Sequence, residues 1–216
     1  MRMFSKGCGV LAVLALVPAA GCLRRDLTHT IYVSPSGVTW SAMDKDVRSD
    51  DPDPGTRLLE EHDYVLGVQV EQHGIARALR ALNGTRVQTK VLRGDRPFTV
   101  LTEARFNDLA ALAAAMMKAA YVRGDATTER DGCERTVRVW FDPESGTAAD
   151  TSPLAELMSD AAGYRIVLTE GRFVRAEGFT IESDGGAATP GAPVVTEDGL
   201  ARAALTWIEG WCAGGE

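Results

Sequence analysis

The sequence contains few of the residues from which common catalytic and metal sites are built. Its 216 residues include three histidines and four cysteines, and only 6% are aromatic. The histidines, His29, His62 and His73, lack the i, i+4 spacing that metal sites favour on a helix. The motifs GxGxxG, GxxxxGK[ST] and GxSxG, which bind nucleotides or carry a hydrolase serine, do not occur. We therefore expect no cofactor, no metal and no catalytic residue.

Positive charge is also scarce. The chain carries 23 basic and 30 acidic residues, a net charge of −7. Nucleic-acid-binding proteins concentrate positive charge to displace counterions from phosphates, and adhesion to anionic lipid depends on the same sign. The composition, with 45% hydrophobic and 25% charged residues, is that of a globular protein. It argues against nucleic acid as a partner.

The longest apolar run lies at the N-terminus. Residues 1–21 begin with Arg2 and Lys6, continue through an apolar run from Cys8 to Ala20, and end in small residues. This three-part layout is typical of a secretory signal peptide. The run is about 13 residues long, whereas a helix needs roughly 20 residues to span a bilayer. We expect the segment to be cleaved.

Residues Ala19-Ala20-Gly21-Cys22 resemble the lipobox of bacterial lipoproteins. The resemblance implies that the Cys22 thiol carries diacylglycerol and that cleavage leaves Cys22, with an acyl chain such as palmitate on its amine, as the new N-terminus. Stable anchoring takes two hydrophobic signals, which these chains exceed. The alternative is an ordinary signal peptide cleaved after Ala20 or Gly21. Because Leu23 follows the cysteine, a Gram-negative host would place the protein in the outer membrane.

Two cysteines remain once Cys8 is removed and Cys22 is lipidated. Outside the cytoplasm, such a pair is a disulfide candidate, which predicts a bond between Cys133 and Cys212. The alternatives are a buried free thiol at Cys212 and an exposed one at Cys133. No CxxC motif occurs, so neither a redox dithiol nor a structural zinc site is indicated.

Turn residues separate short strand-like runs along most of the chain. We predict hairpins from 26–33 with 38–47, 85–93 with 97–106, 126–130 with 134–141, and 164–173 with 178–183. Helices are predicted from Asp53-Pro54, from Gly74 to about Leu82, after the cap residue Asn107, and from Ser152-Pro153 to Gly163. In the first of them the apolar positions at helical spacing are Leu58, Leu59, His62, Val65 and Leu66.

Hairpins separated by helices imply an α+β fold in which helices pack on one face of an antiparallel sheet. We divide the chain into the signal peptide 1–21, an α+β domain 22–183, a Gly/Ala/Pro-rich loop 184–196 and a C-terminal helix within 197–216. The helix is predicted to dock on the domain, although its stripe is also suited to an exposed partner-binding site. The stripe consists of Leu200, Ala204, Trp207, Ile208 and Trp211.

A seven-residue segment occurs twice. Val100–Phe106, VLTEARF, recurs as 167–173, VLTEGRF, with six of seven positions identical. In a strand, the apolar residues of each copy would share one face and the charged residues the other. The charged set is Glu103, Arg105, Glu170 and Arg172. It predicts either exposed cross-strand ion pairs or the lining of a groove for a polar head group or a partner's backbone. Arginine neighbours would keep both carboxylates ionised, which disfavours a general-acid role.

The predicted mature N-terminus is similar to the opening of LppM-type bacterial lipoprotein domains. The residues that carry the similarity are Cys22, the run DLTHTIYV at 26–33, and Val38-Thr39-Trp40 after a turn. The similarity implies an envelope lipoprotein with a sheet-and-helix domain that binds lipid or glycolipid. It transfers no catalytic residue.

Three functions remain open on these grounds. A non-enzymatic module that binds a lipid or an envelope protein leads, because an anchor is present and a catalytic constellation is not. A structural or assembly lipoprotein of the envelope comes second, and an unrecognised hydrolase third. An apolar cavity between sheet and helices would favour ligand binding, and a flat apolar patch would favour a protein partner.

Overall fold

The computed structural model of the chain describes residues 23–146, 157 and 161–213. The predicted signal peptide, Cys22 and most of the helix predicted after Ser152 lie outside the described residues. None of the helices in the described part is long and apolar enough to cross a membrane.

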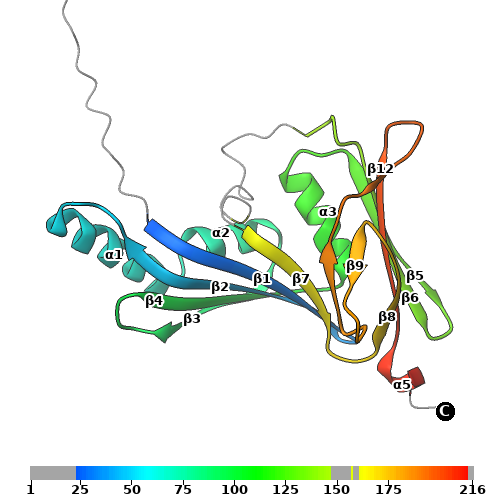
Figure 1. The fold of residues 1–216 in the computed structure, drawn as a ribbon, viewed down its shortest axis with the longest axis horizontal. Helices are drawn as coiled ribbons and strands as arrows, with labels where there is room; N and C mark the ends of the chain where they lie inside the picture. Colours follow the sequence, from blue (N-terminus) through cyan, green and yellow to red (C-terminus); the bar gives the residue numbers. More distant parts are fainter. Residues whose placement is uncertain (1–22, 147–156, 158–160, 214–216) are drawn as a thin grey trace, which may run out of the picture.

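Two sheets and three longer helices make up the described chain (Figure 1). The strands of the first half are β1 (Leu23–Ser34), β2 (Gly37–Ser49), β3 (Thr85–Arg93), β4 (Phe98–Phe106), β5 (Gly124–Asp131) and β6 (Glu134–Phe141). Those of the second half are β7 (Ala161–Leu168), β8 (Arg172–Glu177), β9 (Phe179–Ile181), β10 (Ala187–Pro190), β11 (Val194–Val195) and β12 (Ala201–Ile208). The helices are α1 (Pro54–Gln69), α2 (Gly74–Ala81), α3 (Leu109–Ala119) and the short α5 (Gly210–Ala213).

The first sheet has seven strands in the order β3-β4-β2-β1-β7-β10-β9. The second has the order β11-β12-β6-β5, with β8 also paired to β12. Most neighbours are antiparallel, but β1 and β7 pair in parallel. The predicted α+β class is confirmed, and the strands divide between two sheets where a single sheet was expected.

The first three predicted hairpins form in the predicted places. In β1, the residues Leu27, His29, Ile31 and Val33 are buried alternately, as a strand with one core face requires. Gly37 begins β2 at a φ of 134°, and a Cβ there would lie 2.9 Å from the Phe106 carbonyl oxygen. A larger residue would therefore disturb both the turn and the neighbouring strand β4.

The helices begin close to the predicted residues. Asp53 caps α1 by accepting a hydrogen bond from the Thr56 amide at 2.7 Å, and Pro54 occupies the first turn. The cap of α3 is Asp108, one residue after the predicted Asn107, and it accepts from the Ala111 amide. Helices α1 and α2 pack against the first sheet, whereas α3 packs chiefly against β5 and β6 of the second. Figure 1 shows α3 standing between β7 and the second sheet.

The predicted C-terminal helix is wrong, because residues 201–208 form strand β12. All eight residues of β12 pair with β6, and five of them also pair with β8. The segment does pack on the domain, but as a strand: Leu205 and Trp207 are buried and Trp211 is exposed. Pairing with β6 and β8 satisfies the backbone of this segment while it buries Leu205 and Trp207 in the core.

The predicted loop 184–196 and the last predicted hairpin are also corrected. Strands β10 and β11 lie within 184–196. The structure does not contain the predicted hairpin of residues 164–173 with 178–183. Strand β7 instead pairs with β1 and β10, whereas β8 pairs with β12 and β9 pairs with β10. The region predicted as a linker therefore contributes strands to both sheets.

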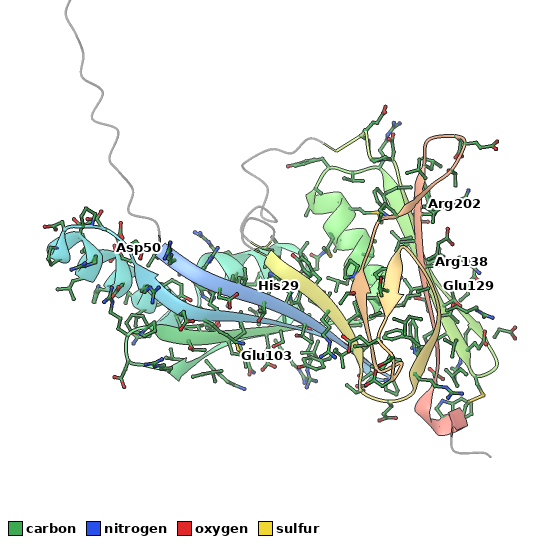
Figure 2. The ribbon with its side chains drawn as sticks, viewed as in Figure 1. His29, Asp50, Glu103, Glu129, Arg138 and Arg202 are labelled. Atoms are coloured by element: carbon green, nitrogen blue, oxygen red, sulfur yellow. A yellow bond between two sulfur atoms is a disulfide. The ribbon has the colours of Figure 1, made fainter. Side chains whose placement is uncertain are left out.

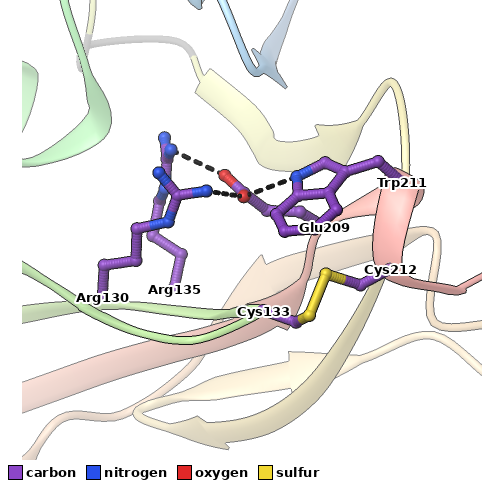
Figure 3. The surroundings of a disulfide bond; sticks show 6 residues. All are labelled: Arg130, Cys133, Arg135, Glu209, Trp211 and Cys212. Carbon is purple, nitrogen blue, oxygen red and sulfur yellow. Dashed lines mark hydrogen bonds and ion pairs between the residues drawn. A yellow bond between two sulfur atoms is a disulfide. The ribbon is translucent and has the colours of Figure 1, made fainter.

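The two candidate cysteines are joined. Cys133, in the β5–β6 turn, bonds to Cys212 of α5, with 5.9 Å between the Cα atoms (Figure 3). Beside the bond, the buried Glu209 carboxylate binds Arg130 at 2.7 Å and Arg135 at 2.6 Å. The Trp211 indole N–H donates to the same carboxylate at 2.9 Å. The disulfide and this cluster fasten the end of β12 to the β5–β6 turn.

The double substitution Cys133→Ala/Cys212→Ala is expected to lower the free energy of unfolding by about 4 kcal/mol, because the bond closes a loop of 79 residues. Urea denaturation at neutral pH measures the change. A reductant should destabilise the wild type and leave the double variant unaffected. If wild type and variant unfold at the same urea concentration, the bond does not stabilise the fold.

Candidate functional site

An apolar cavity of about 300 Å³ lies where the two sheets and α3 meet. One wall comes from the first sheet, through Ile31 of β1 and Tyr164 and Ile166 of β7. The other walls come from α3 and from the second sheet, and Phe179 and Pro190 complete the lining. The residues of these other walls are Leu109, Leu112, Ala113 and Met116 of α3, Val137 and Val139 of β6, and Leu205 of β12.

An aromatic and histidine cluster supports the β7 wall. The Trp40 indole N–H donates to His29 Nδ1 at 3.0 Å, so His29 carries its proton on Nε2 and donates it to the Leu157 carbonyl oxygen at 3.0 Å. The Tyr164 ring stacks on His29 with 4.6 Å between centroids. Its hydroxyl donates to the same Leu157 carbonyl at 3.2 Å. These bonds fix the position of the tyrosine ring that faces the cavity.

The cavity and its immediate support are uncharged at neutral pH. Every residue that lines it is apolar or aromatic. Burial lowers the pKa of His29 to about 4 and raises the pKa of Tyr164 to about 12, so both remain neutral. A site with these walls suits an apolar ligand and gives an ionised one no partner.

The repeated heptapeptide does not form two equivalent strands. The first copy lies entirely in β4, with Val100, Thr102, Ala104 and Phe106 on the buried face as predicted. The second copy runs from the end of β7 through a turn into β8. The two copies differ only where Ala104 is replaced by Gly171, which has a φ of 90°. A Cβ at Gly171 would lie 2.0 Å from the Ile208 carbonyl oxygen, so the turn requires glycine there.

The four charged residues of the repeat are therefore not brought together as a groove. Glu103 faces Lys90 of β3 at 3.6 Å, and Arg105 is exposed near the end of β4. Glu170 and Arg172 lie around the β7–β8 turn, where Glu170 borders a small hollow beside Arg135 and Glu209. Figure 2 shows Glu103 on the first sheet, away from the labelled residues of the second. The four residues thus do not line one shared groove, whereas Glu103 does form an exposed cross-strand ion pair, with Lys90 of β3.

A second hollow, of about 430 Å³, lies over β6 and β12. Arg138, Arg202, Glu177 and the partly exposed Trp140 are among its lining residues, and Figure 2 labels Arg138 and Arg202 there. Arg138 is paired with Glu129 at 3.1 Å. This hollow has charged side chains among its apolar ones, whereas the lining of the cavity has no charged side chain.

The remaining predicted candidates do not form a site. His62 is exposed, and His73 is buried beneath α2 with its Nε2 at 2.9 Å from the Thr102 hydroxyl. Within the residues that the structure describes, no group of three or more His, Cys, Asp or Glu side chains could hold a metal ion. Cys22, the predicted lipidation site, lies outside those residues.

Sequence reasoning missed the cavity because its walls come from distant segments. Ile31 and Ile166 are aligned in the parallel pairing of β1 with β7, and no local pattern indicates that pairing. The available signal was the apolar stripe of α3, in which Leu112 and Met116 are four residues apart and so share one helix face. Their neighbours across the cavity, Val139 and Leu205, depend on the second sheet, which the sequence did not indicate.

The stability of the fold should fall as the pH decreases from about 6.5 to 4. Burial lowers the pKa of both His29 and His73 to about 4, so the unfolded chain binds protons that the folded chain excludes. Each histidine should cost up to about 3 kcal/mol at pH 4. Denaturation of the His73→Asn variant should show a smaller loss of stability between pH 6.5 and 5 than the wild type, whereas the exposed control His62→Asn should match the wild type. Equal pH dependence in all three proteins would contradict this account.

No protein-family model and no curated protein matches the chain. Among solved structures, the chain is similar to the NMR structure of the folded domain of LppM from Mycobacterium tuberculosis, with 16% sequence identity and a TM-score of 0.36. The similarity covers 88% of this chain and 92% of that chain. It agrees with the resemblance of the N-terminal residues to LppM-type lipoprotein domains. At this identity and TM-score, it supplies no ligand and no residue role for this chain.

Proposed function

We propose that this chain is a lipid-anchored protein of the bacterial cell envelope whose domain binds one apolar chain, such as the acyl chain of a lipid. The observation that carries the proposal is the apolar cavity between the two sheets and α3. The anchor rests on the lipobox-like residues that end at Cys22. The role is one of binding, with no catalytic step, no cofactor and no nucleic acid.

The size and chemistry of the cavity support a single acyl chain. Its volume of about 300 Å³ is at the lower end of the range of small-molecule sites, roughly 300–1,000 Å³. Each methylene group transferred from water into it would contribute about 0.8 kcal/mol. The walls offer no charge to hold an ionised head group, so the head group would remain outside.

Part of the lining retains exposure to solvent, which favours a ligand at this site. Met116, Val139, Tyr164 and Phe179 pack against the hydrophobic core but retain some exposure. An apolar ligand would remove these surfaces from water without displacing a core residue. A fully collapsed core would leave no such space, since protein interiors are close-packed.

A protein partner is the second candidate function, favoured by the hollow over β6 and β12. Arg202 and Glu177 line that hollow and form no ion pair with any described residue. Trp140 of β6 lies opposite Arg202 of β12 in the same hollow, and aromatic and arginine side chains are frequent at protein interfaces. A structural or assembly role in the envelope would use this surface and would not require the cavity.

The substitution Ala113→Phe should abolish binding of an apolar probe, because the larger side chain on α3 enters the cavity. The matched control Ala111→Phe makes the same change at an exposed position of the same helix and should bind like the wild type. Titration with a fluorescent long-chain fatty acid measures the affinity of the three proteins. No binding by the wild type, or equal binding by wild type and Ala113→Phe, would refute the cavity as the site.

The anchor is tested separately through Cys22. Cys22→Ser should leave the protein unprocessed or release it from membranes, because the thiol that accepts diacylglycerol is lost. Metabolic labelling with a fatty-acid probe and membrane fractionation measure the change. A variant that is labelled and fractionates like the wild type would show that Cys22 is not the lipidated residue.

A further inference from the structure

Helix α1 exposes its three leucines and buries Glu61 and Val68. Leu58 and Leu59 are 71% and 62% exposed, whereas Glu61 is 6% exposed. Most of the apolar residues whose spacing predicted this helix thus face away from the domain. At steps of four, Leu58, His62, Leu66 and Val70 form one exposed stripe, which with Leu59 we term the outer face of α1.

Polar bonds fix this orientation. The Glu61 carboxylate accepts from the Ser49 amide at 2.9 Å and from Arg96 Nε at 2.8 Å. The neighbouring Glu60 accepts from the Ser49 hydroxyl. Rotating α1 to bury its leucines would break these bonds and leave the amide of the buried Ser49 without its acceptor, which is costly for a buried polar group. The outer face therefore stays exposed in the isolated domain.

The same bonds place α1 at the N-terminal end of the domain. Ser49, which binds α1, is paired with Leu23, the first residue of β1. Figure 1 shows α1 beside the beginning of β1, at the end of the molecule opposite α5. Cys22 directly precedes Leu23, and one residue spans at most about 3.6 Å. A lipid on Cys22 would hold this end of the domain at the bilayer surface.

We propose that the outer face of α1 lies against the bilayer in which the N-terminal lipid is embedded, and so fixes the orientation of the domain. This inference rests on the proposed anchor at Cys22. A surface helix that exposes several leucines next to the anchored end of the domain can lie at the interface between head groups and acyl chains. The contact also accounts for large exposed apolar residues, which a protein surrounded only by water rarely clusters.

Charge at this end argues for an apolar contact over an electrostatic one. Arg24 is paired with Asp50 at 2.8 Å, and Arg96 is paired with Glu61. Asp63 lies next to the outer face, beside His62. The described residues from Leu23 to Asp63 carry more acidic than basic side chains, so they offer no excess of positive charge to anionic lipid. The contact should form on neutral phosphatidylcholine and should not weaken with added salt.

A fluorophore on the outer face tests the inference. The disulfide and the acylated Cys22 leave no free thiol in the mature protein, so a cysteine introduced by His62→Cys can be labelled alone with the environment-sensitive dye NBD. Glu197→Cys, in the exposed turn before β12, provides the control position. The acylated protein is reconstituted into phosphatidylcholine vesicles, with and without brominated acyl chains, and isolated by flotation. We expect blue-shifted emission and bromine quenching for the label at position 62, and neither for the label at position 197.

A matched pair of substitutions separates membrane contact from the effect of the dye. Leu58→Ser/Leu59→Ser should remove the blue shift and the quenching at position 62. Val194→Ser/Val195→Ser, which changes two exposed valines of β11, should retain both. All these residues are exposed, so each variant is expected to fold.

Several results would overturn the inference. A floated protein whose label at position 62 behaves as in water would refute it and leave the anchor standing, whereas protein that does not float would overturn both. A blue shift at position 62 in Cys22→Ser protein without vesicles, increasing with protein concentration, would show that a second copy covers the outer face. Persistence of quenching in Leu58→Ser/Leu59→Ser would show that these leucines do not form the contact.

Discussion

The parallel pairing of β1 with β7 is the constraint on which the rest of the structure depends. It aligns residues 27–33 with 161–168 and joins the first hairpin to the second half of the chain. Parallel neighbours need a long crossover, and here the crossover contains α1 to α3 and β2 to β6. The returning strand brings Ile166 beside Ile31 and places Tyr164 over His29. The same fold places α3 and the second sheet against the β1–β7 pair, and the apolar cavity lies between them.

The arrangement separates three features along the molecule. The end that carries α1 and the beginning of β1 is next to the proposed anchor, the cavity lies between the sheets, and the disulfide closes the far end (Figure 1). Cross-linking Cys133 to Cys212 holds β12 against β6, which keeps Leu205 and Val137 in the cavity wall. In the proposed account, the domain receives an apolar chain at a site held away from the bilayer surface.

The sequence predicted the helix starts and hairpins, because these depend on residues that are close together in the chain. Asp53-Pro54 marks the beginning of α1 because a cap and a fixed proline φ act within one turn, and the first three hairpins follow from turn residues between alternating runs. Residues 201–208 were misassigned because Ala, Arg and Leu favour a helix, whereas the pairing with β6 and β8 decides for a strand. The repeated heptapeptide also shows the limit of a local pattern. Its first copy is a strand, whereas the second copy contains a turn at Gly171, where the first has Ala104.

The cavity and the orientation of α1 could not be predicted from the sequence, because both depend on contacts between distant residues. The apolar spacing of α1 predicted a helix, but its orientation is set by Glu61 bonding to Ser49 and Arg96, residues 12 and 35 positions away. Likewise, the cavity combines β1, α3, β6, β7 and β12, which come together through the pairing within the two sheets and the packing of α3 between distant segments. Pairing over such distances is settled by the sum of packing and backbone hydrogen bonds, which a local pattern does not encode.

The most direct test of the central claim is native mass spectrometry of the acylated protein extracted from its own membrane in mild detergent. The account predicts a population that carries one non-covalently bound lipid in addition to the mass of the N-terminal acyl chains. The Ala113→Phe variant, whose cavity is filled, should lack this bound lipid. Wild-type protein that carries no lipid, or lipid that is retained equally by Ala113→Phe, would contradict the claim that the cavity holds an acyl chain.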